Sequence, residues 1–189
     1  KGDKIMFPNA ARTDSILKLF QKTMLDVNIP AFKLRILNDS LCLYEFKVRV
    51  GKNQSRYLKM GDRITNLRTK TGTGSIVSHV RNPDYYNPVS GKQYYLTKRD
   101  DKKTTKMPQI PFLETEISGV RNGQMIHPTT NPETLGKPYS NGCIGVSEAD
   151  AWIIYYYAPI GTKITIRYDL NAENGKQILN DIYGYKLNK

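Results

Sequence analysis

The chain has 189 residues, of which 39% are hydrophobic, and a formal net charge of +12 from 29 Lys and Arg against 17 Asp and Glu. This length is enough for one domain with a real core, and no apolar run approaches the roughly 18 residues that span a membrane as a helix. The charge favours polyanionic partners such as an anionic wall polymer or envelope surface. Because the basic residues are scattered, with one dense run at 98–106, we expect no nucleic-acid partner.

The N-terminal stretch has the spacing of an amphipathic helix. Apolar residues recur at helical intervals through residues 13–27, from Ile16 to Met24, and Thr13 or Asp14 can serve as N-cap. Pro30 ends the pattern. We therefore predict a helical extension over residues 1–30.

From residue 31 the period changes to two, which is typical of strands. Residues 31–37 and 41–50 alternate on either side of the turn-forming residues 38–40 and predict a β-hairpin. Short strands are expected around 57–58 and 75–80. The intervening TKTGTG segment has no phosphate-loop spacing, so a turn between strands is the favoured interpretation, and His79 is expected to be structural or at the surface.

Two polar loops follow. The first, residues 82–88, carries Tyr85 and Tyr86 between two prolines, and such a loop either lines a groove or packs its tyrosines. The second, KRDDKKTTK at 98–106, is polar throughout and predicts a solvated connection that serves either as a lid or as a plain loop.

The remaining elements alternate strand and helix. Residues 110–126 have β character and lead into His127, and a capping-box spacing after Cys143 predicts a short helix, followed by a strand at 163–169. Helical spacing returns in the tail, residues 170–189. The sequence predicts a mainly-β domain at 31–169 with short helices at the N-terminus, after Cys143 and at the C-terminus, the last packing on the domain.

The two cysteines lie in different surroundings. Cys42 lies in LCLYEFKV, a strand pattern, and is expected to be a small buried hydrophobic residue. Cys143 follows a glycine in a bent, polar loop, where a thiol is more often reactive. We predict no disulfide between them.

The stretch HPTTNPETLGKPYSNGCIG, residues 127–145, carries the chemistry. A thiol attacks acyl groups as thiolate, and His127 and Cys143 are the one His–Cys pair in this stretch that can hold and return the proton. The Gly142–Cys143 step allows a turn whose N–H groups point at one spot and can stabilise an oxyanion.

The same stretch resembles the catalytic motif of the L,D-transpeptidases (YkuD-type domain). The resemblance rests on His127, twelve intervening residues and then Ser140-Asn141-Gly142-Cys143-Ile144, and it extends over residues 31–169. It implies a β-sandwich or barrel and a cysteine-dependent enzyme of peptidoglycan assembly. Such an enzyme releases D-Ala from stem tetrapeptides through a thioester and forms 3→3 cross-links that contribute to cell shape.

The resemblance also implies roles for individual residues. Cys143 is the nucleophile, His127 the base, Gly142 and Cys143 the oxyanion donors, and Ser140 and Asn141 shape the loop. Residues of a possible substrate groove are Tyr85, Tyr86, Tyr139 and Gly145. The chain departs from the usual motif twice, with Asn141 in place of a histidine and Gly145 in place of an arginine.

Several expectations accompany this hypothesis. Neither a cofactor nor a metal is expected, and we expect a monomer at the cell envelope, periplasmic or secreted, although the sequence displays no leader. Two alternatives stay open: an L,D-carboxypeptidase that uses water as acceptor, or a catalytically impaired wall-binding protein of the same fold.

Overall fold

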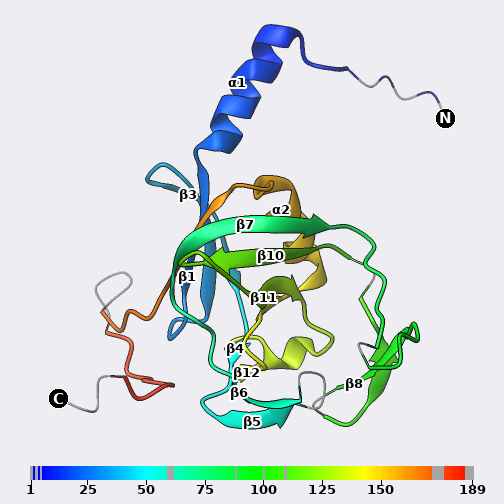
Figure 1. The fold of residues 1–189 in the computed structure, drawn as a ribbon. Coiled ribbons are helices and arrows are strands. Elements are labelled where there is room, and N and C mark those ends of the chain that lie inside the picture. Colours follow the sequence, from blue (N-terminus) through cyan, green and yellow to red (C-terminus); the bar gives the residue numbers. More distant parts are fainter. Residues whose placement is uncertain are drawn as a thin grey trace.

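The computed structural model describes residues 2, 4, 6–58, 62–87, 89–99, 101–108, 110–171 and 177–185. Its main feature is an eight-stranded sheet in the order β13-β11-β10-β7-β14-β1-β2-β3 (Figure 1). The β1–β14 and β11–β13 pairs are parallel and the other neighbours antiparallel. The strands of this sheet are β1 (Thr23–Asn28), β2 (Lys33–Asn38), β3 (Leu41–Lys47), β7 (Gly72–Val80), β10 (Phe112–Ile117), β11 (Val120–Pro128), β13 (Ile144–Val146) and β14 (Lys163–Arg167).

The two edges of this sheet meet at a single backbone bridge. Just after β3, the Arg49 N–H donates to the Gly145 carbonyl at 2.8 Å, and the Gly145 N–H donates back at 3.0 Å. Since Gly145 lies in the opposite edge strand β13, the bridge nearly closes the sheet into a barrel. The predicted mainly-β fold is therefore confirmed, as is the hairpin formed by β2 and β3.

Three short strand pairs lie outside the main sheet. The pairs are β4 (Val50–Gly51) with β12 (Pro138–Ser140), β5 (Ser55–Leu58) with β6 (Arg63–Asn66), and β8 (Leu96–Lys98) with β9 (Thr104–Lys106). Two of them, β4–β12 and β5–β6, lie at the end shown at the bottom of Figure 1. A 3-10 turn, η1 (Pro132–Thr134), precedes β12.

The core consists of aliphatic side chains from the inner faces of the strands. Helix α2 (Glu148–Tyr157) covers one side and buries Ala151 and Ile154. Its N-cap is Ser147, whose hydroxyl accepts the Asp150 N–H at 3.1 Å, as the capping spacing predicts. The fully buried residues of the sheet include Leu25, Val27, Leu34, Ile36, Ile76, Ile126 and Ile144.

The N-terminal helix is shorter than predicted. Helix α1 (Ala10–Gln21) begins after its N-cap Asn9 and projects from the barrel without a buried residue (Figure 1). Residues 23–28, predicted to be helical, instead form β1. Leu25, Val27 and Ile29 alternate with Asp26 and Asn28, and this period of two, paired with β2 and β14, overrides the helical spacing.

The predicted C-terminal helix is absent from residues 177–185, and residues 172–176 and 186–189 lie outside the described part. Hydrogen bonds to side-chain oxygens occupy backbone N–H groups that a helix would use. The Tyr183 N–H donates to the Tyr168 hydroxyl at 2.9 Å, and the Tyr185 N–H donates to the Asp181 carboxylate at 3.1 Å. The segment nevertheless packs on the domain, because Tyr183 is buried in its core.

Two segments that were predicted to be connections contribute residues to strands. Gly72 and Gly74 of TKTGTG lie inside β7, where a Cβ on Gly74 would come within 1.7 Å of the Glu116 carbonyl oxygen of β10. Glycine here permits close strand approach and does not make a turn. The polar run 98–106 belongs to the β8–β9 hairpin, in which Thr97 pairs with Thr105, while Asp100 lies outside the described residues.

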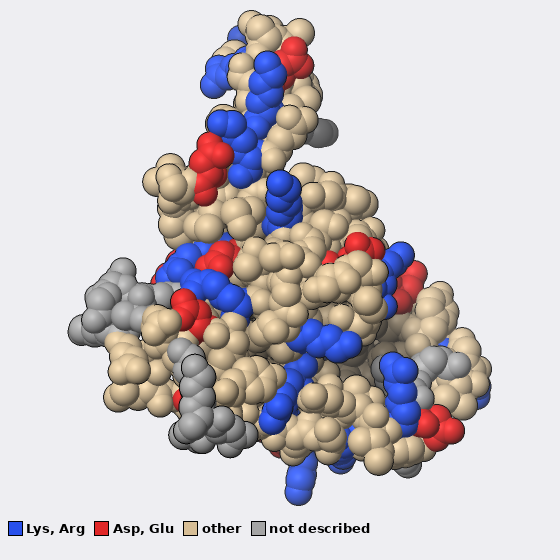
Figure 2. Space-filling model, turned by 60° about the vertical axis from the view of Figure 1, so that its left-hand side comes forward, with Lys and Arg blue, Asp and Glu red and all other residues tan. Residues whose placement is uncertain are grey.

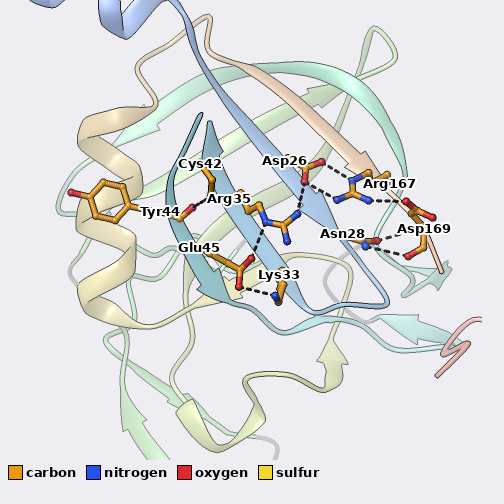
Figure 3. A network of polar contacts seen from close by, with 9 residues as sticks. All are labelled: Asp26, Asn28, Lys33, Arg35, Cys42, Tyr44, Glu45, Arg167 and Asp169. Atoms are coloured by element: carbon orange, nitrogen blue, oxygen red, sulfur yellow. Dashed lines mark hydrogen bonds and ion pairs between the residues drawn. The ribbon is translucent and has the colours of Figure 1, made fainter. Parts of the chain in front are cut away.

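A polar network covers the outer face of the strands β14, β1, β2 and β3 (Figure 3). Asp26, 8% exposed, accepts two hydrogen bonds from the Arg167 guanidinium at 2.8 and 3.0 Å and lies 3.7 Å from that of Arg35. Cys42 lies on the same strands and is exposed, so the prediction of burial was wrong. The reason is that β3 is an edge strand that buries only Phe46.

On the face drawn in Figure 2, Lys and Arg side chains are scattered over α1 and the barrel and do not form one stripe. Within the described part of the chain, none of the helices combines the length and apolar character that crossing a bilayer requires.

Candidate functional site

Strand register brings His127 and Cys143 together. In the parallel pair β11–β13, Ile126 lies opposite Ile144 and His127 opposite Gly145. Ile126 and Ile144 point into the core, so the alternate residues, His127 and Cys143, point outward on the other face. The predicted delivery of His127 at a strand end is confirmed, because β11 ends at Pro128.

The loop before Cys143 is shaped by glycine and by one buried hydroxyl. Gly142 has a φ of +114°, a conformation that side chains rarely adopt. Ser140, 3% exposed, donates to the Cys143 carbonyl at 2.6 Å and accepts the Gly142 N–H at 3.2 Å. Of the two predicted oxyanion donors, the Gly142 N–H is thus engaged with Ser140, which makes the Cys143 N–H the stronger candidate.

A second set of buried hydrogen bonds fixes that N–H. The Thr69 hydroxyl donates to the Gly142 carbonyl at 3.0 Å and accepts the Gly51 N–H at 2.8 Å. The Tyr183 hydroxyl in turn accepts the Thr69 N–H at 3.0 Å and donates to the Gly51 carbonyl at 2.8 Å. Because a trans peptide holds C=O and N–H on opposite sides, anchoring the Gly142 carbonyl directs the Cys143 N–H away from Thr69.

The His127 ring is oriented by the backbone. Its Nδ1 lies 2.8 Å from the Pro128 carbonyl oxygen, and since a carbonyl accepts only, Nδ1 carries the proton of that bond. Nε2 is left for Cys143, whose thiol interacts with His127 closely enough to shift the pKa of both groups, while Cys143 Sγ itself lies 4.0 Å from the Gly123 carbonyl oxygen. His127 therefore has the tautomer that a thiol partner requires.

Each of the two groups shifts the pKa of the other. Burial raises the pKa of the Cys143 thiol, but the hydrogen bond and charge of His127 and a hydrogen bond from the Met125 backbone outweigh it, so this pKa is lowered. Burial lowers the pKa of His127, and the hydrogen bond and charge of Cys143 outweigh it, so this pKa is raised. These shifts favour a thiolate–imidazolium pair, which is the nucleophilic form of a cysteine.

A cavity of about 650 Å³ opens beside this pair. His127, Ser140 and Asn141 line it, whereas Cys143 is not among its lining residues and is connected to it through its interaction with His127. Five basic side chains and one carboxylate, that of Asp84, belong to the described lining; the basic residues are Arg49, Lys52, Arg56, Lys98 and Arg99. Such a cavity attracts an anionic ligand.

The predicted groove residues divide into two groups. Tyr85 and Tyr139 line the cavity, and burial raises the pKa of Tyr85 to about 12, which keeps its hydroxyl protonated. That hydroxyl donates to the Pro108 carbonyl at 2.7 Å. Tyr86 is exposed and outside the lining, Gly145 is buried in β13, and Pro88 of the same loop lies outside the described residues.

The β8–β9 hairpin forms a wall of the cavity through residues 97–99. Arg99 forms two hydrogen bonds to Asp101, at 2.7 and 3.0 Å, and one to the amide oxygen of the buried Asn131 at 2.8 Å. The hairpin is therefore tied to the loop that follows His127. Within the residues described, no cluster of His, Cys, Asp or Glu is suited to hold a metal ion.

Sequence reasoning missed Arg49, Thr69 and Tyr183. Arg49 lies near the end of a predicted strand, Thr69 opens the TKTGTG segment and Tyr183 was assigned to a helix, so no local pattern linked them to Cys143. The one available signal was the glycine at 145, since a missing side chain next to a reactive cysteine leaves space that another residue can fill.

His79 has the structural role that was expected. Its ring stacks on Tyr155 with centroids 3.7 Å apart, and burial lowers its pKa, with a backbone hydrogen bond at Tyr155 opposing that shift. It lies on β7 and does not line the cavity.

Several solved structures share this fold. An L,D-transpeptidase from Xylanimonas cellulosilytica is 14% identical, with a TM-score of 0.56 over 78% of this chain and 61% of that one. L,D-transpeptidase 3 from Mycobacterium tuberculosis, solved with a faropenem-derived adduct, is 14% identical, with a TM-score of 0.54 over 77% and 60%. The chain thus spans about three fifths of the length of these structures.

The sequence itself carries the family assignment. A search of curated proteins found no significant match. The sequence profile of the L,D-transpeptidase catalytic domain (YkuD) matches residues 22–166, which include β1, His127, Cys143 and most of β14. The chain belongs to the L,D-transpeptidase catalytic domain family.

Proposed function

We propose that this chain is a cysteine-dependent L,D-transpeptidase that acts on peptidoglycan stem tetrapeptides at the cell envelope. The observation that carries the proposal is the Cys143–His127 pair, which strand register brings together and whose members shift each other's pKa, beside a cationic cavity in a chain of this family. The peptide stems of peptidoglycan carry carboxylates, which suit the basic lining and the net charge of +12. We expect the protein to act as a monomer without a cofactor.

The first half of the reaction forms a thioester. The Cys143 thiolate attacks the carbonyl carbon of the third stem residue, and a C–S bond forms while the carbonyl oxygen becomes an oxyanion. The Cys143 N–H, held in place by Thr69 through the Gly142 peptide, donates to that oxyanion. As the C–N bond to the terminal D-Ala breaks, His127 Nε2 gives its proton to the leaving amine.

The second half transfers the acyl group. Neutral His127 takes a proton from the side-chain amine of another stem, and the amine attacks the thioester carbonyl. The C–S bond then breaks, the 3→3 amide remains, and the thiolate–imidazolium pair is restored. Water in place of the amine makes the same site an L,D-carboxypeptidase.

The test uses a carbapenem as a substrate mimic, because the related enzyme from Mycobacterium tuberculosis was solved with an adduct derived from a penem, faropenem. Intact mass should show one adduct on the wild-type protein and none on Cys143→Ala. Cys42→Ser is the matched control and should acylate like the wild type, since Cys42 lies on the outer face of β3. Folded wild-type protein that takes no adduct would instead support the wall-binding alternative.

A further inference from the structure

The side chain of Arg49 crosses the position that Gly145 leaves empty. The two residues face each other across the bridge that nearly closes the barrel, with backbone hydrogen bonds of 2.8 and 3.0 Å. A Cβ on Gly145 would lie 2.6 Å from Cγ and 2.9 Å from Nε of Arg49. Since the nearest atoms belong to the Arg49 side chain, this position of Arg49 requires that residue 145 be glycine.

The Arg49 guanidinium has a defined direction. Its NH1 donates to the Thr134 hydroxyl at 3.1 Å, and that hydroxyl donates to the Asn131 carbonyl at 2.6 Å. Arg49 also lines the cavity beside His127. Its charge adds to the lowering of the pKa of Cys143 and opposes the rise of the pKa of His127, so the guanidinium lies within electrostatic reach of both reacting groups.

These contacts give Arg49 the geometry of an anion-binding group. A guanidinium presents donors in a planar fork that matches a carboxylate, and prior anchoring to Thr134 reduces the entropy lost on binding. Four further Lys and Arg side chains belong to the same lining, against the one carboxylate of Asp84, which adds to the attraction of an anion. A carboxylate there would lie next to the bond that Cys143 attacks.

We propose that Arg49 binds a carboxylate of the donor peptide within one residue of the scissile carbonyl, and that Gly145 is glycine to let the Arg49 side chain reach it. The proposal rests on the proposed function. Two carboxylates qualify, the C-terminal one of the leaving D-Ala and the side-chain one of a diamino-acid third residue. Recognition of either makes Arg49 a specificity-determining residue.

The experiment compares acylation of Cys143 by three synthetic tetrapeptides, followed by quenched intact-mass measurement. One has both carboxylates free, one is amidated at the C-terminus, and one is amidated on the third residue. Wild-type protein should acylate about 10- to 100-fold more slowly with one of the two amidated peptides, as expected for loss of a charge-assisted pair. The peptide that is slowed identifies the recognised carboxylate.

Arg49→Gln should acylate slowly with the free peptide and no longer distinguish it from the amidated one, as in a double-mutant cycle. Gly145→Ala should lose the same discrimination by displacing the Arg49 side chain. Lys52→Gln removes another charge of the lining and should retain the discrimination. If Arg49 were merely structural, Arg49→Gln would slow acylation by all three peptides by the same factor relative to wild type, and the discrimination among them would persist. That result would overturn the proposal.

Different results would overturn the role of Arg49 and the proposed function. If wild-type protein discriminates among the peptides and Arg49→Gln discriminates equally well, only the assignment to Arg49 is wrong. If no peptide acylates wild-type Cys143, the proposed function is wrong, and the carboxylate assignment falls with it.

Discussion

Replacing Thr69 by Val tests how the loop before Cys143 is held. The Thr69 side chain is buried, and its hydroxyl is the one bridge between the Gly51 N–H and the Gly142 carbonyl. Valine has nearly the same shape but offers neither donor nor acceptor. A buried N–H left without a partner costs about 1–3 kcal/mol, and the lost bond to the carbonyl about 0.5–1.5 kcal/mol. The free energy of unfolding should therefore fall by about 2–4 kcal/mol, measured by urea titration.

The same substitution should slow acylation. With the Gly142 carbonyl released, the peptide that carries the Cys143 N–H is free to rotate, and removal of an oxyanion donor costs up to about 10²–10³ in rate. We expect a loss of about 10- to 100-fold in carbapenem acylation, because the donor is misdirected and not removed.

Thr69→Ser is the matched control, since it keeps the hydroxyl and loses one methyl group worth about 1 kcal/mol. Its acylation rate should stay near that of the wild type. If Thr69→Val kept both its stability within about 1 kcal/mol and its acylation rate within about twofold, the reasoning would be refuted.

Three further predictions concern the pair and the barrel. In a Cys42→Ser background, Cys143 should still be alkylated at a pH at which ordinary thiols no longer react, because its pKa is lowered. Acidification through that lowered pKa should stop the alkylation. His127→Ala should shift the pH dependence of alkylation to higher pH. Asp26→Ala should lower the free energy of unfolding by about 3 kcal/mol, since it leaves two guanidinium groups without their shared carboxylate; a loss below about 1 kcal/mol would contradict this. Gly74→Ala should lower the free energy of unfolding, measured by urea titration, by more than about 2 kcal/mol, because β7 and β10 must move apart to make room for the methyl group. Unchanged stability would contradict this and show that β10 moves without cost.

Strands with a clear period of two were predictable from the sequence. The hairpin of β2 and β3, the strand leading to His127 and the capped helix after Cys143 all follow local patterns that tertiary packing does not oppose. The sequence misled where tertiary contacts override local spacing. β1 took residues that continued a helical pattern because it pairs on both sides, with β2 and β14.

The chemistry of the site was more predictable than its support. His127 and Cys143 were proposed because acyl transfer by a thiol needs those residue types, and one short stretch of the sequence contains both. Their supports come from distant segments: Thr69 lies 73 residues before Gly142, and Tyr183 lies 132 residues after Gly51. Only the closed barrel brings these groups together, so no local pattern could indicate them.

The most direct test of the account is to follow Cys143 during turnover of a stem tetrapeptide. Rapid acid quenching and intact mass should show the protein with one added tripeptide acyl group, with D-Ala released in step, and peptide mapping should place the group on Cys143. Cys143→Ala should show neither the adduct nor D-Ala release. D-Ala release without an acyl group on Cys143, or release by Cys143→Ala, would contradict the thioester mechanism.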